Sequence, residues 1–417
     1  RVYIFYGGPD SKLLSGGAMN VESLEPDVTI NPYRFSEELG AALAVADMNG
    51  DECDDLVTGR GDVHILYGAS SLASEYSSDE LTALDGARVS DQWGLTALGD
   101  IDGDGLPELA IEESDGAKIF DVDGEQGELH YPIEFWDAEV DVYDISAGDV
   151  DGDGLSDLVV IGSSDSGAFT GAWIVQGAES LVDGDIWLPY PGEEAIGFSA
   201  ITLVPDDSED NVQHAMVGDY DGDGLADILV MATLDDNGDP DAGGANLITG
   251  ASYTSALFAN GDSVILGESM TALTAWDIGA ETIFGDIPNG HIAGTAGFIL
   301  DPQCDYDGDK VRNRTVVLGV TEYGESTGAE DSRIFALTDK TLAECATVRG
   351  ADGTEITVGC ADQEFVGDRH DRYAERILIA DLDGDGLSDA VIGAPEDATN
   401  AERSGRVEVL FTSRDYE

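Results

Sequence analysis

The chain has 417 residues, of which 87 are acidic and 18 are Lys or Arg, giving a formal net charge of −69. Such an acidic surface repels nucleic-acid phosphates and anionic lipid headgroups, so we expect neither as a partner. Hydrophobic residues make up 42% of the chain in short runs. They favour a folded core over disorder, and no run is long enough for membrane insertion.

The first predicted element is a strand at Arg1-Val-Tyr-Ile-Phe-Tyr6, which resembles the segment Arg406-Val-Glu-Val-Leu-Phe411 near the other end. Between them, short runs rich in Val and Ile alternate with Gly- and Asp-rich segments, as strands and turns do. No segment shows helical periodicity over three turns. The pattern therefore predicts an all-β protein whose ends fall at the same phase of a repeat.

A nine-residue pattern, Asp-x-Asp-Gly-Asp-Gly-x-x-Asp, recurs six times with variations. The copies occupy 47–55, 100–108, 149–157, 219–227, 305–313 and 381–389. Apolar runs follow them, as at 158–161, 228–231 and 390–392, so we expect each loop to join two strands. A third strand often follows, as at 63–67. The repetition predicts one domain over 1–417 with one unit per loop, and a degenerate unit in 263–300 would make seven units rather than six.

The loops carry the oxygen ligands that calcium prefers, since this cation takes six to eight oxygens at roughly 2.3–2.6 Å. Side chains at positions 1, 3 and 5 converge when the loop curls, and Gly at position 6 permits the curl. The carbonyl at position 7 and the acid at position 9 would complete the shell. An EF-hand shares this spacing, but its position 12 must be Glu, and here Val160, Val230 and Ile392 fall inside predicted strands.

The sequence thus predicts five to six Ca²⁺ ions, with the carbonyl as ligand at position 7 and the side chain elsewhere. In the first three loops the ligands are Asp47, Asn49, Asp51, Cys53 and Asp55; Asp100, Asp102, Asp104, Leu106 and Glu108; and Asp149, Asp151, Asp153, Leu155 and Asp157. In the last three they are Asp219, Asp221, Asp223, Leu225 and Asp227; Asp305, Asp307, Asp309, Val311 and Asn313; and Asp381, Asp383, Asp385, Leu387 and Asp389. The Leu side chains at position 7 are free to enter the core. The loop 305–313 departs most from the pattern, because Lys310 replaces Gly at position 6.

This unit resembles the FG-GAP repeat of the integrin α-subunit propeller, which also occurs in bacterial secreted proteins. Its Phe-Gly signature is approached by Trp93-Gly94 and in part by Phe198-Ser199, and its Gly-Ala-Pro signature occurs at 393–395. The resemblance covers nearly the whole chain. It implies an extracellular β-propeller with metal loops on one face and ligand-binding loops commonly on the other. It implies no activity, because such folds host many functions.

Four cysteines, Cys53, Cys304, Cys345 and Cys360, suit an oxidising compartment. They allow three pairings, of which Cys345 with Cys360 could bridge a hairpin, or they are free thiols. The chain's charge exceeds what six calcium ions would neutralise. We therefore expect a saline habitat, such as that of a marine or halophilic microbe.

Three other motifs have a structural and a functional interpretation. Arg60-Gly61-Asp62 is an integrin-recognition tripeptide, but its position between two predicted strands favours a hairpin turn. The segment 368–376 holds three arginines and is either a salt-bridged connection or an anion-binding spot. The acidic segment 235–241 is a long hairpin connection or a further calcium site.

No catalytic constellation is visible. The five histidines are scattered, and neither a nucleophile elbow nor a phosphate-binding loop occurs. We therefore expect a non-enzymatic adhesion or ligand-binding module for an extracellular protein or a glycan. The alternatives are a self-assembling, calcium-dependent subunit of a filament, sheath or surface layer, and a carbohydrate-active enzyme domain.

Overall fold

The structure, a computed structural model, describes the chain in segments. Up to residue 250 these are 1–6, 26–34, 39–89, 94–113, 116–123, 128–134, 140–164, 170–178, 181, 188, 199–205, 212–219, 224–232 and 244–250. Beyond residue 250 they are residue 382 and the strands whose bounds are given below.

The described residues form an all-β structure, as the sequence predicts, with strands gathered in seven sheets. Helical turns among these residues are of the 3-10 type, at Ser78–Glu80, Leu181 and Gly250. Within these described segments, no helix has the length and apolar character needed to cross a membrane. Runs of Val, Ile and Leu form the strands because branched side chains pack well on a pleated surface.

Three sheets come from the first 134 residues. The first contains β1 (Val2–Ile4), β2 (Val28–Asn31) and β5 (Glu75–Ser77); the second contains β3 (Ala42–Ala46), β4 (Asp55–Leu66) and β6 (Thr82–Val89). The third contains β7 (Leu95–Ala97), β8 (Leu109–Glu113), β9 (Gly116–Asp123) and β10 (Glu128–Glu134). The strand expected at 1–6 is thus shorter, at Val2–Ile4.

Four sheets come from the rest of the chain. The fourth runs β11 (Val140–Gly148), β12 (Asp157–Ser164), β13 (Thr170–Val175), β14 (Ala200–Pro205), β18 (Ser263–Leu266), β19 (Leu273–Thr274). The fifth runs β15 (Val212–Gly218), β16 (Asp227–Ala232), β17 (Gly244–Ile248), β20 (Glu281–Phe284), β25 (Thr354–Thr357), β24 (Thr347–Val348). The sixth runs β21 (Gly290–Asp301), β22 (Asn313–Glu322), β23 (Arg333–Thr338), β26 (Gln363–Val366), and the seventh runs β27 (Arg376–Ala380), β28 (Asp389–Ala394), β29 (Arg406–Leu410).

Every Asp-rich loop joins the first two strands of one sheet, which confirms the prediction of a strand on either side. The two strands are antiparallel, and in five of the six sheets the last residue of the first strand faces position 9. These pairs are Ala46↔Asp55, Gly148↔Asp157, Gly218↔Asp227, Asp301↔Asn313 and Ala380↔Asp389. In the third sheet Ala97 faces Leu109, the residue after position 9. The loops are thus hairpin connections, whereas EF-hand loops connect helices.

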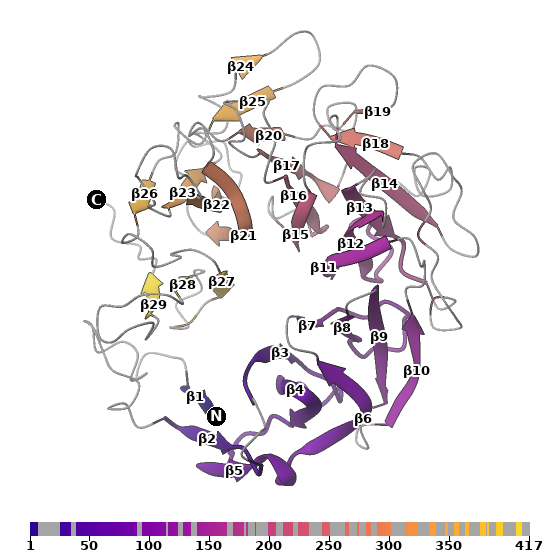
Figure 1. The fold of residues 1–417 in the computed structure, drawn as a ribbon, viewed down its shortest axis with the longest axis vertical. Coiled ribbons are helices and arrows are strands. Elements are labelled where there is room, and N and C mark those ends of the chain that lie inside the picture. The colour runs from indigo at the N-terminus through magenta and orange to yellow at the C-terminus, as the bar shows by residue number, and fades with distance from the viewer. Residues whose placement is uncertain are drawn as a thin grey trace.

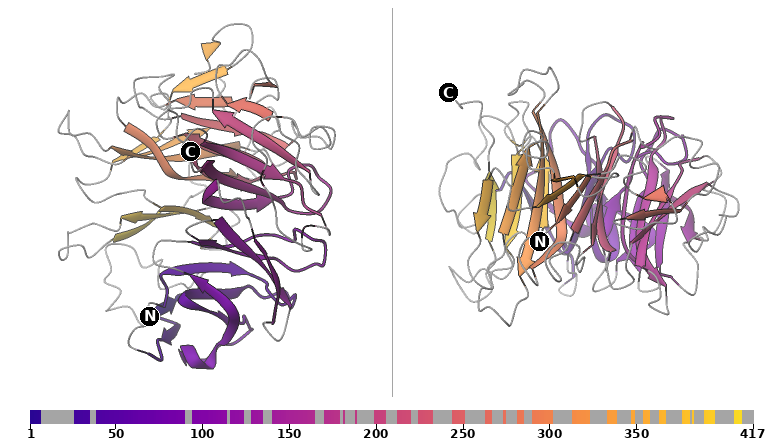
Figure 2. Two further views of the ribbon diagram at one scale, coloured as in Figure 1. Left: turned by 45° about the vertical axis from the view of Figure 1, so that its right-hand side comes forward. Right: turned by 90° about the horizontal axis from the view of Figure 1, so that it is seen from above.

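The sheets follow one another around a common centre in chain order, as the colour gradient in Figure 1 shows. In the six sheets that carry the loops, the first strand lies nearest the centre and later strands lie further out (Figure 1). The small sheet β1-β2-β5 lies beside the sheet β3-β4-β6. The two further views in Figure 2 show the same succession of sheets.

The hydrophobic core lies between neighbouring sheets. One cluster joins Val57 and Ile65 of β4 to Ile111 of β8, and a second joins Ile119 of β9 to the fully buried Trp173 of β13. A third joins β12, β13 and β14 to β15, β16 and β17. The third and fourth sheets each contribute to two of these clusters and so bury both faces, which explains near-continuous apolar runs such as 158–161.

Strand β4 folds back on itself at Arg60–Gly61, as the hairpin interpretation of this tripeptide predicts. Gly61 has φ +82°, and a Cβ at Gly59 would lie 2.7 Å from the carbonyl oxygen of Asp62. The strand assignment continues through the turn from Asp55 to Leu66. Asp62 is paired with Arg88 at 3.3 Å.

The segment 263–300 contributes to three sheets. Strand β18 pairs in parallel with β14, and β19 pairs with β18. Strand β20 pairs with β17, and β21 opens the sixth sheet. A seventh unit in this segment stays a prediction.

Candidate metal centres

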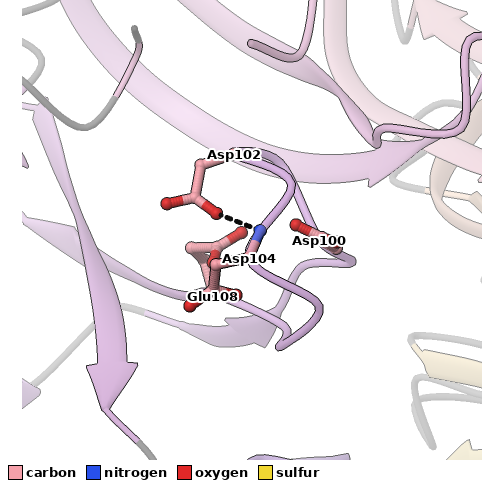
Figure 3. Close-up of side chains that lie close together, drawn as sticks. All are labelled: Asp100, Asp102, Asp104 and Glu108. Carbon is pink, nitrogen blue, oxygen red and sulfur yellow. Dashed lines mark hydrogen bonds between the residues drawn. The ribbon is translucent and has the colours of Figure 1, made fainter. Parts of the chain in front are cut away.

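The loop 100–108 brings four carboxylates together between β7 and β8. One oxygen from each of Asp100, Asp102, Asp104 and Glu108 lies within 4.8 Å of the others (Figure 3). All four belong to the predicted ligand set at positions 1, 3, 5 and 9. Like charges at this separation repel strongly unless protons or a cation neutralise them.

Backbone N–H groups hold this loop in its curled form. The amides of Gly103 and Gly105 donate to the two carboxylate oxygens of Asp100 at 2.6 and 3.0 Å. Both glycines have positive φ, of 87° and 94°, a region that residues with a Cβ avoid. The amide of Asp104 donates to Asp102 at 3.0 Å, the bond drawn in Figure 3. The Gly residues thus let the carboxylate at position 1 organise the loop.

Glu108 is the most unusual residue of this group. Its side chain is fully buried, and its Oε2 accepts a hydrogen bond of 2.7 Å from the amide of Ile101. Its Oε1 is also buried and has no hydrogen-bond partner among the described residues. Burial, followed by the charges of the three aspartates, raises the pKa of Glu108 from 4.5 to about 8. An unsatisfied buried oxygen costs about 1–3 kcal/mol, and a cation between the four carboxylates would supply its missing partner. The residues present therefore fit calcium.

The loop 149–157 repeats this arrangement between β11 and β12. Oxygens of Asp149, Asp151 and Asp153 lie within 4.8 Å of one another. Asp149 accepts from the amides of Gly152 and Gly154 at 2.7 and 3.0 Å, as Asp100 does from its glycines. A neighbouring side chain also reaches this loop, since Gln176 Nε2 donates to Asp151 at 2.6 Å.

Asp157, at position 9, lies outside that group of three. One of its oxygens accepts from the amide of Val150 and the other from the amide of Gly177, both at 2.9 Å. The side chain is fully buried, and burial raises its pKa from 3.8 to about 7 against the effect of the two N–H donors. Asp157 therefore ties its loop to the end of the third strand of the sheet.

The same tie recurs in other sheets, and it was not predicted from the sequence. Asp55 accepts from Met48 and Gly68 at 2.9 and 2.6 Å, and Asp227 accepts from Gly250 at 2.7 Å. Asp389 makes the bond to the start of its own loop, from the amide of Leu382 at 2.9 Å. A signal was available, because a Gly-Ala dipeptide follows the third strand at 68–69, 177–178 and 250–251. A Cβ on these glycines would lie 2.3–2.6 Å from the carbonyl oxygen at position 8 of the same sheet's loop.

The loop 47–55 reaches the same curl with a non-Gly residue. Glu52 stands at position 6 with φ +70°, and its amide donates to Asp47 at 2.8 Å. The amide of Asp51 donates to both Asp47 and Asn49 at 3.0 Å. Cys53, at position 7, is a free thiol.

The other predicted sites are described in part or not at all. In the loop 219–227, the amide of Gly224 donates to Asp219 at 3.2 Å, as its counterparts do in the loops 100–108 and 149–157. Several predicted sites lie outside the described residues. They are 220–223, 305–312, 381, 383–388, the segments 235–241 and 368–375, and Cys304, Cys345 and Cys360.

No protein-family profile matches the chain, and no curated protein matches it. Among solved structures, the chain is similar to one described as the crystal structure of BBS1N in complex with ARL6DN, soaked with lead. The two share 9% sequence identity over 90% of this chain and 92% of that chain, with a TM-score of 0.34. A similarity this distant supports no conclusion about the function of this chain.

Proposed function

We propose that this chain is an extracellular β-propeller of the FG-GAP type, built from six or seven blades and held rigid by five to six Ca²⁺ ions. The observation that carries the proposal is the buried Oε1 of Glu108, which lies beside three aspartates and has no hydrogen-bond partner in the part of the chain that the structure describes. The repetition of the loop and the succession of sheets around a common centre support it.

The residues that would hold calcium are the side chains at positions 1, 3 and 5 together with the carbonyl at position 7. In the loop 100–108, Glu108 adds a carboxylate from position 9. When bound, the ion neutralises the repulsion between three or four carboxylates. The backbone amides already bound to Asp100 and Asp149 orient these ligands before the ion arrives.

We further propose that the molecule is a non-enzymatic, secreted or cell-surface module for adhesion or ligand binding. Its ligand is an extracellular protein or a glycan, bound by loops other than the metal loops. The strongly acidic composition supports an extracellular, saline setting, because screening by salt lets such a chain stay compact.

Calcium titration calorimetry of the wild type and of Glu108→Gln tests the metal assignment. The variant keeps the shape of the side chain and removes one charge at the site. Asp79→Asn is the matched control, because Asp79 is exposed and lies outside the loops. We expect Glu108→Gln to lose one calcium equivalent and Asp79→Asn to lose none. Equal stoichiometry in all three proteins would contradict the assignment.

Binding to a glycan array and to extracellular-matrix proteins, with calcium and with EDTA, tests the ligand-binding role. We expect the protein to bind a ligand in calcium but not in EDTA, and to remain a monomer at every protein concentration. A calcium-dependent polymer in light scattering, with no ligand bound, would replace this role by self-assembly.

A further inference from the structure

Neighbouring Asp-rich loops are in direct contact with one another. The amide of Ser156, at position 8 of the loop 149–157, donates to the carbonyl oxygen of Asp100 in the preceding loop at 2.7 Å. In the next pair, the amide of Ala226 donates to the carbonyl oxygen of Asp149, also at 2.7 Å. Position 8 of one loop is thus bonded to position 1 of the loop before it.

The Leu at position 7 makes a second contact in the same direction, from a later loop to the loop before it. A Cβ at Gly103 would lie 3.2 Å from Leu155 Cδ2, and a Cβ at Gly152 would lie 2.8 Å from Leu225 Cδ2. Leu106 lies equally close to Gly50 in the first pair, at 3.1 Å. The glycine at position 4 of each loop therefore supports the leucine of the next.

A third contact lies just before the loops 100–108 and 149–157. A Cβ at Gly99 would collide with the side chain of Ser156 at 2.1 Å from Oγ, and one at Gly148 would lie 2.8 Å from the Cβ of Ala226. Position 8 of the later loop is therefore seated on the backbone that leads into the earlier loop. Glycine is required there by this close approach.

These contacts use the residues that would bind the metal. Asp100 and Asp149 offer their carboxylates at position 1 and their carbonyls to the next loop. Leu155 would offer its carbonyl to its own calcium and presents its side chain to Gly103 of the preceding loop. Ordering the segment 155–156 around one ion therefore also orders position 1 and position 4 of the loop before it.

We propose that adjacent loops bind calcium cooperatively, each filled loop holding the preceding loop in its binding conformation. This inference rests on the proposed calcium binding and adds two points to it. Each loop contacts the loop before it in the chain, and only adjacent loops are coupled directly. Because coupling is reciprocal, an ion in the earlier loop equally favours binding in the later one. Loops separated by a third loop are coupled only through it, and therefore less.

A double-mutant cycle at position 5 tests the proposal. Asp51→Asn, Asp104→Asn and Asp153→Asn each remove one ligand charge, while the Asn oxygen can still accept the local amide bond made by Cys53, Leu106 and Leu155, respectively. Calcium-dependent stabilisation is measured as the ratio of unfolding constants in EDTA and in saturating calcium. The adjacent pair combines the changes at 104 and 153, and the non-adjacent control pair combines those at 51 and 153.

Each single variant reduces the calcium-dependent stabilisation by some factor. We expect the double variant of the adjacent loops to reduce it by a factor about fivefold or more smaller than the product of the two single factors. The non-adjacent pair should be multiplicative to within about twofold. Introducing Leu155→Ala into the adjacent cycle should remove most of the discrepancy, whereas Leu155→Met, which keeps an apolar side chain of similar size, should retain it. If Leu155→Ala fails to fold, the comparison of the adjacent and non-adjacent pairs decides by itself.

Two outcomes would overturn the proposal while leaving calcium binding in place. One is multiplicative behaviour in the adjacent pair, and the other is an equal discrepancy in both pairs. A wild-type protein that gains no stability from calcium would overturn the proposed function, and the cooperativity with it.

Discussion

Glu52 occupies the one described position 6 that is not glycine. Its backbone has φ +70°, a region that costs a residue with a Cβ about 1–2 kcal/mol. We expect Glu52→Gly to raise the free energy of unfolding by about 1 kcal/mol, measured by urea denaturation. Glu52→Ala keeps the Cβ and removes the charge, so it should give none of the gain that comes from the backbone. Equal gains in both variants would attribute the effect to charge.

Glu108 gives the fold a pH dependence that calcium should offset. Its pKa is raised from 4.5 to about 8 in the folded protein, so the fold favours the protonated form. Without calcium, the associated stability is fully present below pH 4.5 and is lost as the pH rises towards 8. We expect Glu108→Gln to be more stable than the wild type in EDTA at pH 8, by on the order of 2–4 kcal/mol, and closely similar at pH 4.5.

In saturating calcium at pH 8 this difference should shrink by about 3 kcal/mol, because the variant lacks one ligand charge and loses the stabilisation by that ion. Chemical denaturation at the two pH values, with and without calcium, measures all four differences. A wild type more stable than Glu108→Gln at pH 8 in EDTA would contradict this account of the residue.

Among the described residues, the acid at position 9 ties its loop to the end of the third strand in the sheets that contain Asp55, Asp157 and Asp227. Asp157 joins Val150 at the start of the loop to Gly177 after the third strand, through two buried hydrogen bonds. In an Asp157→Asn variant, the side-chain NH2 group would face one of these two backbone N–H donors, which would then have no acceptor. Asp157 therefore differs in role from Asp153, which faces its two neighbouring carboxylates.

We expect Asp157→Asn to destabilise the protein by about 1–3 kcal/mol at pH 8, above the pKa of about 7, both in EDTA and in calcium. Asp153→Asn should be destabilising only in calcium. Gly177→Ala should resemble Asp157→Asn, since its Cβ would lie 2.6 Å from the carbonyl oxygen of Ser156. Differential scanning calorimetry of the three variants in both conditions makes the comparison. A loss confined to calcium in all three would assign Asp157 to the metal instead.

The sequence predicts the loops and the strands that flank them well, because both depend on local spacing. Alternating Asp and Gly fix the curl, and Val-rich runs such as 158–161 fix the strands. The tie at position 9 is signalled only by the Gly-Ala dipeptide after the third strand, whose meaning is hidden in the sequence because Gly177 approaches Asp157 only in the folded sheet. From the sequence alone, the Leu side chains at position 7 are free to enter the core. In the structure Leu155 is half-buried against Gly103, a contact between units that no repeat pattern reveals.

At the scale of the whole molecule, the charge of −69 is far larger than the metal sites explain. Six divalent ions would add twelve positive charges and leave about −57. The remaining repulsion between exposed carboxylates weakens as salt shortens the screening length from about 8 Å at 0.15 M to about 3 Å at 1 M.

With calcium kept saturating, we therefore expect the melting temperature to rise steadily between 0.05 M and 2 M NaCl. Sorbitol at equal osmolality is the control, since it changes water activity without screening charge. A melting temperature that is independent of NaCl, or that rises equally in sorbitol, would contradict the saline setting.

Thermal unfolding of the wild type in excess calcium and in EDTA, at constant ionic strength, tests the central claim most directly. Each ion held at about 100 times its dissociation constant adds about 2.7 kcal/mol. Five to six such ions predict that calcium raises the melting temperature by about 15–20 °C. The same melting temperature in both conditions would show that the Asp-rich loops do not hold this fold together through calcium.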